Sequence, residues 1–179
     1  MLKTIHTFGD PILRKKARRI EVIDQQINTL VNDMFETMYA AEGIGLAAPQ
    51  VGESIRLFII DINPMDSNEG KRVFINPEIL EFGDEKDVYE EGCLSIPTVH
   101  EDVLRPTGIR IKYQSLDGEE HDEWIDTFLA RVIQHEFDHL EGVLFTDRLS
   151  ALKRSLLKNT LKKIANGEIE VELSENYQL

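Results

Sequence analysis

The stretch Gln134-His135-Glu136-Phe137-Asp138-His139-Leu140-Glu141-Gly142 decides the fold that we predict for this chain. Because an α-helix turns about 100° per residue, His135 and His139 fall one turn apart on one face, where two imidazoles can bind the same metal ion. Extending the helix back to Trp124 adds a broad apolar arc of Ile125, Phe128, Leu129, Val132, Ile133 and Leu140. Glu136 lies in the middle of this arc, so its charge needs a cation or strong hydrogen bonds nearby.

The residues from His135 to His139 form the H-E-x-x-H pattern of metal-dependent hydrolases. In these enzymes both histidines bind the metal and the glutamate transfers protons. The alternative is a chance match, with each histidine hydrogen-bonded in an apolar core. The place of Glu136 on the apolar arc favours a metal site, because a bound cation is the simplest compensation for a buried carboxylate.

The composition suits one domain with a sizeable core, because the chain has 179 residues of which 41% are hydrophobic. We therefore predict a single domain over residues 1–179. A lone cysteine, Cys93, suits a reducing compartment. No apolar run is long enough to span a membrane and no signal peptide begins the chain, so we expect a cytoplasmic protein with no membrane attachment. A net charge of −13 predicts no direct DNA binding and would confine any RNA contact to a local basic patch.

The remaining sequence predicts mostly strands, with one further helix near each end of the chain. A first helix is expected from Asp24, an N-capping residue type, to Gly43, which could adopt a left-handed conformation. Strands are expected at 55–62, 73–75, 79–82 and 109–113, and in the segment ending at Trp124. No βαβ rhythm is present. The predicted fold is therefore α+β, with mostly antiparallel sheets packed around the central helix that carries the H-E-x-x-H motif.

The stretch Gly43-Ile44-Gly45-Leu46-Ala47-Ala48-Pro49-Gln50 is predicted to be a shaped loop, since its small residues and proline suit neither a helix nor a strand interior. Its glycines allow another backbone to approach closely, so a peptide substrate could lie alongside it. The third glycine and the Gly-Lys-Ser/Thr sequence of phosphate-binding loops are missing. A loop that only turns the chain is the alternative.

A catalytic metal of this kind commonly takes three protein ligands and leaves one position to water. Metzincin proteases add a third histidine after the motif, but Phe145 stands at that position. A glutamate from a later segment serves other proteases, and Glu168, Glu170 and Glu172 keep this alternative open. Cys93 is the better candidate, because a thiolate is a strong ligand for zinc and for ferrous iron.

Three stretches together resemble the signature motifs of peptide deformylase, in the same order and with similar spacing. They are residues 43–50, Glu91-Gly92-Cys93-Leu94-Ser95 and residues 134–142. The resemblance implies a metal-dependent hydrolase that removes the N-formyl group from the formyl-methionine of newly synthesised bacterial proteins and releases formate. It also implies one Fe²⁺ per chain, with Zn²⁺, Ni²⁺ or Co²⁺ able to replace it.

The resemblance also implies a role for each motif residue. The implied metal ligands are Cys93, His135 and His139. The implied catalytic residues are Glu136, Gln50, Leu94 and Gly45. Glu136 would move the proton, the Gln50 amide and the Leu94 backbone N–H would stabilise the oxyanion, and Gly45 would limit the space beside the formyl group. The implied substrate-binding residues are Ile44, Gly45, Tyr89, Glu91, Gly92, Phe128 and Val132.

Two positions depart from better-known members of that family. Arg131 stands where an apolar residue is expected, and His100 stands where some members carry arginine. Two other functions also stay open. A zinc endopeptidase would use the same helix with an acidic third ligand, and cleavage of casein would identify it. A binding module with a structural metal would need a fourth protein ligand, for which the sequence offers no good candidate.

Residues 150–166 predict an amphipathic C-terminal helix that stops at Asn166-Gly167. Its apolar positions include Leu152, Leu156, Leu157 and Ile164. Its basic residues are Lys153, Arg154, Lys158, Lys162 and Lys163. In enzymes of the family it resembles, this helix docks on the ribosome, so the ribosome is an implied partner besides the N-formyl-methionyl nascent peptide. The alternative is a solvated helix on its own domain, and the acidic tail, residues 167–179, would oppose RNA binding.

Overall fold

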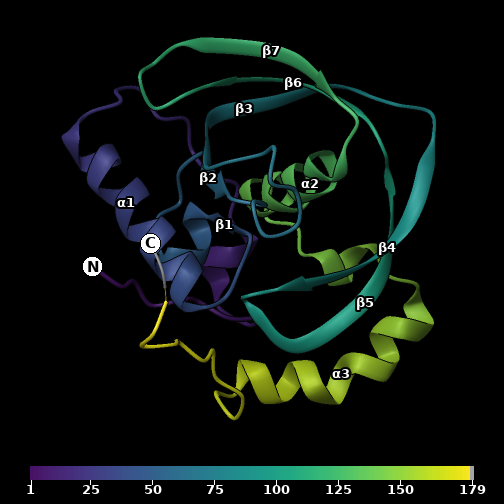
Figure 1. Ribbon diagram of the computed structural model, residues 1–179. Helices are drawn as coiled ribbons and strands as arrows, with labels where there is room; N and C mark the ends of the chain where they lie inside the picture. The colour runs from purple at the N-terminus through teal and green to yellow at the C-terminus, as the bar shows by residue number, and fades with distance from the viewer. Residues whose placement is uncertain (178–179) are drawn as a thin grey trace.

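Helix α2, Phe128–Leu140, lies at the centre of the molecule, with strands curving over it and the other helices outside (Figure 1). The computed structural model describes residues 1–177. Eleven of the thirteen residues of α2 are buried, among them His135, Glu136 and His139. A helix enclosed on nearly all sides keeps polar residues only where other groups pair with them, so this burial already marks the motif as a site.

The start of α2 differs from the prediction. The helix begins at Phe128, after the N-cap Thr127, and not at Trp124. Trp124 and Ile125 belong instead to strand β7, Glu120–Ile125, which pairs with β6, Ile109–Gln114. The apolar residues at the end of β7 and at the start of α2 fall by chance on one helical arc. Their periodicity therefore could not show where the strand ends and the helix begins.

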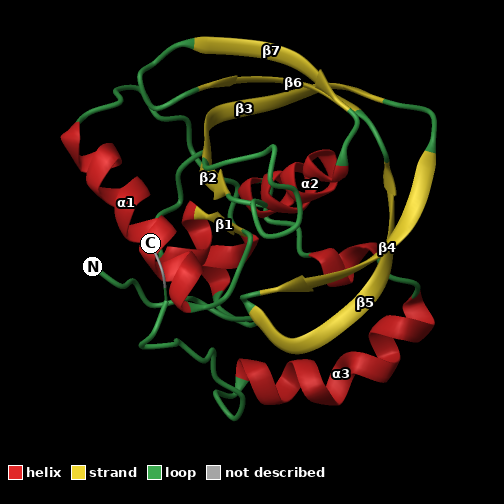
Figure 2. Ribbon diagram, in the orientation of Figure 1, coloured by secondary structure: helices red, strands yellow, loops and turns green. Residues whose placement is uncertain are grey.

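The strands form two antiparallel sheets, which confirms the predicted α+β class (Figure 2). The larger sheet has the order β1-β2-β3-β6-β7 and the smaller is the hairpin β4-β5. The first three strands of the larger sheet are β1, Gly45–Ala47, β2, Leu57–Ile60, and β3, Arg72–Phe82. Strand β2 is buried at every position and therefore lies in the core between α2 and α1.

Two expectations about this sheet are wrong. Residues 43–50 are not only a loop, because they contain β1 and a 3-10 helix, Ala48–Val51, with Leu46, Ala47 and Ala48 wholly buried. The strands expected at 73–75 and 79–82 are one strand, β3, which continues through Asn76 with a shift in register and a backbone φ of 50° there. Such bulges let a proline-containing segment remain in a sheet.

The hairpin of β4, Lys86–Cys93, and β5, Ile96–Pro106, was missed in the sequence. Most of β4 is exposed and polar, so it lacks the apolar alternation by which strands are found. The hairpin curves around α2 and ends beside it, where Cys93 is the last residue of β4 (Figure 1). The long-range packing of this hairpin therefore places the only cysteine of the chain near the central helix.

The outer helices agree closely with their predicted ends. Helix α1, Gln25–Ala40, begins after Asp24, whose side chain accepts hydrogen bonds from the Gln26 and Ile27 backbones, as expected for an N-cap. Its left-handed terminal residue is Glu42, with φ 58°, and not Gly43. Helix α3, Ala151–Ala165, is capped by Ser150.

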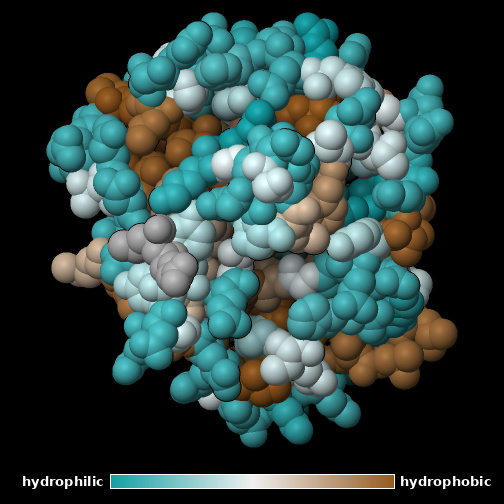
Figure 3. Space-filling view, in the orientation of Figure 1, coloured by the Kyte–Doolittle hydropathy of each residue, from teal (hydrophilic) through white to brown (hydrophobic). Residues whose placement is uncertain are grey.

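Helix α3 packs on the molecule along one side and leaves two leucines exposed. Leu161 and Ile164 are buried, whereas Leu152 and Leu156 are 71% and 75% exposed. Figure 3 shows hydrophobic residues gathered at the lower right, over the start of α3, and a second hydrophobic group at the upper left. In residues 1–177, no helix has the length and apolar character needed to cross a membrane.

Candidate active site

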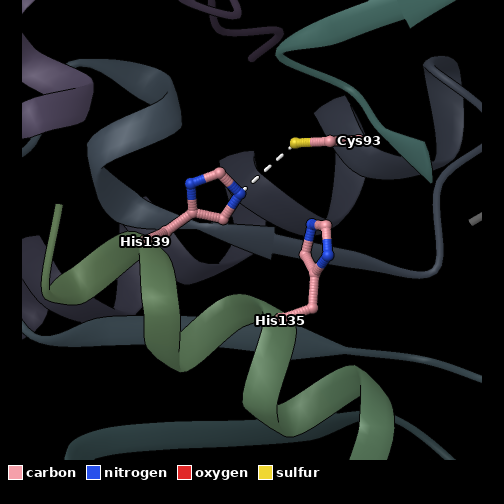
Figure 4. Close-up of side chains that lie close together, drawn as sticks. All are labelled: Cys93, His135 and His139. Atoms are coloured by element: carbon pink, nitrogen blue, oxygen red, sulfur yellow. Dashed lines mark hydrogen bonds between the residues drawn. The ribbon is translucent and has the colours of Figure 1, made fainter. Parts of the chain in front are cut away.

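Three side chains that are distant in the sequence meet at one point beside α2. They are Cys93 from the end of β4 and His135 and His139 from α2, and one possible ligand atom of each lies within 4.8 Å of the others. The Cys93 Sγ lies 3.3 Å from the His139 Nε2, and His135 points to the same space (Figure 4). Among residues 1–177, no other group of three or more His, Cys, Asp or Glu side chains is arranged in this way. The tail glutamates considered as third ligands therefore lie outside the group.

Gln50 connects the first two sequence motifs at this point. Its Oε1 accepts a hydrogen bond of 2.8 Å from the Ala47 backbone N–H, which orients the amide. Its Nε2 donates to the Ser95 Oγ at 3.1 Å and lies 3.5 Å from the Cys93 Sγ. The side chain is 1% exposed. An amide held in this way presents its N–H groups in a constant direction at the edge of the site.

Glu91 orients the first histidine. The His135 Nδ1 donates to the Glu91 Oε1 at 2.9 Å, which leaves the His135 Nε2 for a metal. Arg105 donates two hydrogen bonds to the same carboxylate, at 2.6 and 3.0 Å. Burial by itself would raise the pKa of Glu91, but the hydrogen bonds from His135 and Arg105 outweigh it and lower the pKa to about 2. Glu91 is therefore a carboxylate at neutral pH.

A buried ion-pair network surrounds this contact, and sequence reasoning missed it. Arg105 is 2% exposed and also donates to Asp138 at 2.9 Å. Arg131 donates to Glu91 at 2.7 Å and to the Asp87 carboxylate at 2.8 Å. Arg131 stands at the position where an apolar residue was expected. Because both acidic partners pair with its guanidinium, it adds no free charge to the site. An arginine inside a strand, such as Arg105, carries no local sign of burial.

Glu136 is buried in the site with little hydrogen bonding. It is 3% exposed, and its Oε2 has no hydrogen-bond partner among residues 1–177. Burial raises the pKa of Glu136 to about 7. A side chain at Gly45 would collide with it, because an added Cβ would lie 2.6 Å from the Glu136 Oε1. The glycine therefore provides the space that the carboxylate occupies.

The donor set fits a catalytic metal. One thiol and two imidazoles are ligands that zinc and ferrous iron both accept, and three ligands leave a position open. Burial alone would lower the pKa of His135, but the hydrogen bond to Cys93 and the neighbouring Glu91 raise it well above its usual value. Burial and the neighbouring His135 lower the pKa of His139 well below its usual value, so His139 is in the neutral form that binds a metal.

A cleft of about 1030 Å³ opens over these residues. Tyr89 and Phe128 lie on its wall with ring centroids 5.1 Å apart. The substrate-binding residues predicted from the resemblance all line the cleft: Ile44, Gly45, Tyr89, Glu91, Gly92, Phe128 and Val132. Gln50, Leu94, Glu136 and His100 line it as well. The sequence did not indicate that the tail, residues 168–174, would form part of this wall.

Comparison with known proteins gives one family throughout. The family model described as polypeptide deformylase matches residues 2–155. A peptide deformylase of Christiangramia forsetii is 46% identical over 96% of this chain and 94% of the relative. A peptide deformylase of Pseudothermotoga lettingae is 46% identical over 98% of this chain and 99% of the relative. The crystal structure of a peptide deformylase from Legionella pneumophila has a TM-score of 0.85 and 39% identity over 94% of this chain and 98% of that chain. The crystal structure of the peptide deformylase from Thermotoga maritima has a TM-score of 0.78 and 46% identity. The match covers 84% of this chain and 99% of that chain.

Proposed function

Because this chain belongs to the peptide deformylase family, we propose that its cleft binds the formyl-methionyl end of a nascent peptide and that the residues around Cys93 hydrolyse the formamide bond. The chain is a metal-dependent hydrolase that removes N-formyl groups from nascent peptides. The observation that carries the proposal for the site is the meeting of Cys93, His135 and His139 beside a cleft that Cys93 and His135 line. A structural metal site would require a fourth protein ligand.

In the proposed mechanism, Cys93, His135 and His139 would hold the metal ion. When bound, the metal would supply Lewis-acid chemistry that lowers the pKa of a water. Glu136 accepts the proton of the attacking water and then delivers it to the departing amine. A carboxyl group with a pKa of about 7 suits both steps, because it can hold or release a proton at neutral pH. The products are formate and a peptide with a free N-terminus.

The negative charge that develops on the formyl oxygen needs hydrogen-bond donors already in place. We assign this role to the Gln50 side-chain amide and the Leu94 backbone N–H, both of which line the cleft. The Ala47 contact that holds the Gln50 carbonyl oxygen supports the assignment, since it leaves the amide N–H groups directed toward Cys93. Donors positioned in advance lower the barrier because they need not reorganise during the reaction.

The methionine side chain is assigned to the apolar part of the cleft. Tyr89, Phe128, Val132 and Ile44 supply its walls, and the two aromatic rings contact each other. Arg131 lies over the Tyr89 ring, with its guanidinium carbon 5.6 Å from the ring centroid. This contact and the ion pairs of Arg131 would keep the wall rigid.

Replacing Gly45 by alanine should reduce turnover by roughly 10- to 100-fold. The new Cβ would lie 2.6 Å from the Glu136 Oε1, so the carboxylate must move from its position for proton transfer. Steady-state rates and metal content of the variant check this. Gly70→Ala is the matched control, since no atom lies within 4 Å of its added Cβ. Equal rates in both variants would show that Gly45 is not needed for the position of Glu136.

We propose Fe²⁺ as the physiological metal, with Zn²⁺, Ni²⁺ and Co²⁺ as substitutes. The thiolate and imidazole donors bind all of these ions, so the donor set supports iron without selecting it. Protein purified without oxygen should contain about one iron per chain and release formate from formyl-Met-Ala-Ser. Activity should decay in air, because ferrous iron and its thiolate ligand oxidise, and zinc should restore it only in part. Cleavage of casein without formate release would contradict the proposed function.

Nascent chains emerge from the ribosome, and we propose that the enzyme acts beside it in the cytoplasm through α3. The basic side chains Lys158, Lys162 and Lys163 are exposed on this helix. Two exposed leucines, Leu152 and Leu156, lie near its start. Basic residues beside exposed apolar ones suit a surface that contains both RNA and protein.

Replacing Lys158, Lys162 and Lys163 together by glutamine should weaken cosedimentation with ribosomes by about 10-fold or more at low salt. Formate release from a free peptide should not change. Truncation of α3 is a poorer test, because Leu161 and Ile164 contribute to the core. The control replaces Lys15, Lys86 and Lys112, which are exposed on other elements. Equal cosedimentation of the two triple variants would exclude α3 as the docking surface.

A further inference from the structure

Ser95 is a turn residue that is wholly buried. It follows Leu94 in the short turn between β4 and β5, and it is 0% exposed. Turns usually lie at the surface, where water can hydrogen-bond to their polar groups. A hydroxyl in the interior needs a partner in the protein, because an unpaired one costs free energy. The contacts of Ser95 therefore indicate why a hydroxyl is buried at this position.

The partner of this hydroxyl is the side chain of Gln50, whose Nε2 donates to the Ser95 Oγ at 3.1 Å. The two residues are 45 positions apart in the sequence, so only the packing of the hairpin against Ala48–Val51 brings them together. Within residues 1–177 the hydroxyl makes no other hydrogen bond, and it therefore stabilises neither a helix end nor its own turn. The fold buries the Ser95 hydroxyl specifically against the Gln50 amide.

The Gln50 amide is held at both of its ends. The Ala47 N–H donates to the Oε1 at 2.8 Å, so an amide turned by half a rotation would place one N–H against another. That contact decides which end of the amide faces Ser95. The bond to Ser95 then fixes the angle of the amide plane, which is otherwise free over a broad range. With one N–H of Nε2 on Ser95, the other is left for the space beside the Cys93 Sγ, which is 3.5 Å away.

Residues 6–8 fix the backbones that carry this contact. The His6 N–H donates to the Gln50 carbonyl at 2.7 Å. The Phe8 N–H donates to the Ser95 carbonyl at 2.8 Å. Leu94, whose N–H is the second proposed oxyanion donor, directly precedes Ser95. The bond between the Gln50 and Ser95 side chains therefore joins the two segments that supply the proposed donors.

We propose that Ser95 is a positioning residue for the hydrolysis, because its hydroxyl holds the Gln50 amide at the angle that stabilises the oxyanion. The inference rests on the proposed function, in which Gln50 donates to the developing negative charge. Ser95 does not line the cleft, so it acts through Gln50 and not on the substrate. Without the hydroxyl, the amide must be reoriented during the reaction. The loss therefore appears in kcat and not in KM.

The test is a double-mutant cycle of S95A and Q50A, measured with formyl-Met-Ala-Ser. Q50A should lower kcat by about 100-fold or more, which is the usual cost of losing one oxyanion donor. S95A should lower kcat by about 10-fold, with little change in KM or metal content. The double variant should be no slower than Q50A, because the Ser95 hydroxyl has nothing to position once the amide is gone.

Thr37→Val is the matched control for the loss of a buried hydroxyl. Thr37 is also 0% exposed, and its hydroxyl is hydrogen-bonded within α1 and to Lys3, outside the cleft. This variant should lose some thermal stability but keep its kcat. The proposal is overturned if S95A is as fast as the unaltered chain, if the two losses multiply in the double variant, or if Thr37→Val is slowed as much as S95A.

A second measurement needs no turnover. In the zinc-loaded protein, the Gln50 side-chain N–H signals can be assigned in nuclear magnetic resonance spectra by their loss in Q50A. They should exchange slowly with water in the unaltered chain and rapidly in S95A. Slow exchange in both proteins would show that other contacts fix the amide, against the proposal. If the unaltered chain releases no formate, the proposed function fails, and these signals still test the contact with Ser95.

Discussion

Replacing Glu136 by glutamine is expected to lower the rate of formate release by roughly 100-fold or more, while the protein keeps its metal. Glutamine has nearly the same shape but cannot accept a proton from the attacking water. The fold should tolerate the change, because the Glu136 Oε2 has no hydrogen-bond partner within residues 1–177 and burial disfavours its charge. Little stabilisation is therefore lost with the carboxylate.

The measurement is kcat and KM for formyl-Met-Ala-Ser, with metal per chain determined on the same sample. The loss should lie in kcat, since the residue acts on the proton and not on the methionine side chain. Glu53→Gln is a suitable control, because Glu53 is exposed and does not line the cleft. Near-normal turnover by the Glu136 variant would remove this residue from the mechanism.

Replacing Cys93 by alanine should abolish activity because the protein loses its metal. Cys93 supplies the only sulfur of the metal group, and alanine leaves the two imidazoles of His135 and His139. Changes to outer-shell residues already weaken metal sites by about 10- to 100-fold, so loss of a direct ligand should weaken binding by roughly 100-fold or more. The side chain is only partly buried and small, so the fold should remain.

Elemental analysis after dialysis checks this prediction, and circular dichroism shows whether the variant is folded. Cys93→Ser is the matched variant, because a hydroxyl has a similar size but is a much weaker ligand than a thiolate. It should fall near the alanine variant in metal content. A folded alanine variant that retains one metal per chain would show that the ion is held by other residues.

Local sequence features predicted much of the fold. Helix α1 begins after Asp24, the expected capping residue, and α3 begins one residue after Ser150, where the helix was predicted to start. Capping depends on side chains within a few residues of the helix start, so it can be predicted from the local sequence. The end of β7 and the start of α2 were predicted less well. The apolar residues there suit a strand and a helix equally, and only pairing with β6 decides between them.

The sequence by itself determined the H-E-x-x-H helix, the α+β class and the pairing of two histidines with one glutamate on its face. The three-motif resemblance also named the family, which the comparisons confirm. These features are local or recur in a fixed order along the chain. The thiol could be proposed as the third ligand because the chain has a single cysteine.

Only the tertiary structure decided which distant groups surround that helix. It placed Cys93 beside His139, buried Arg105 between Glu91 and Asp138, filled the space at Gly45 with Glu136, and brought the acidic tail to the cleft. None of these contacts has a local pattern, because each joins segments that are far apart in the chain. They form where packing of the hairpin β4-β5 and α3 around α2 brings the segments together, and burial then makes their charges and spacing important.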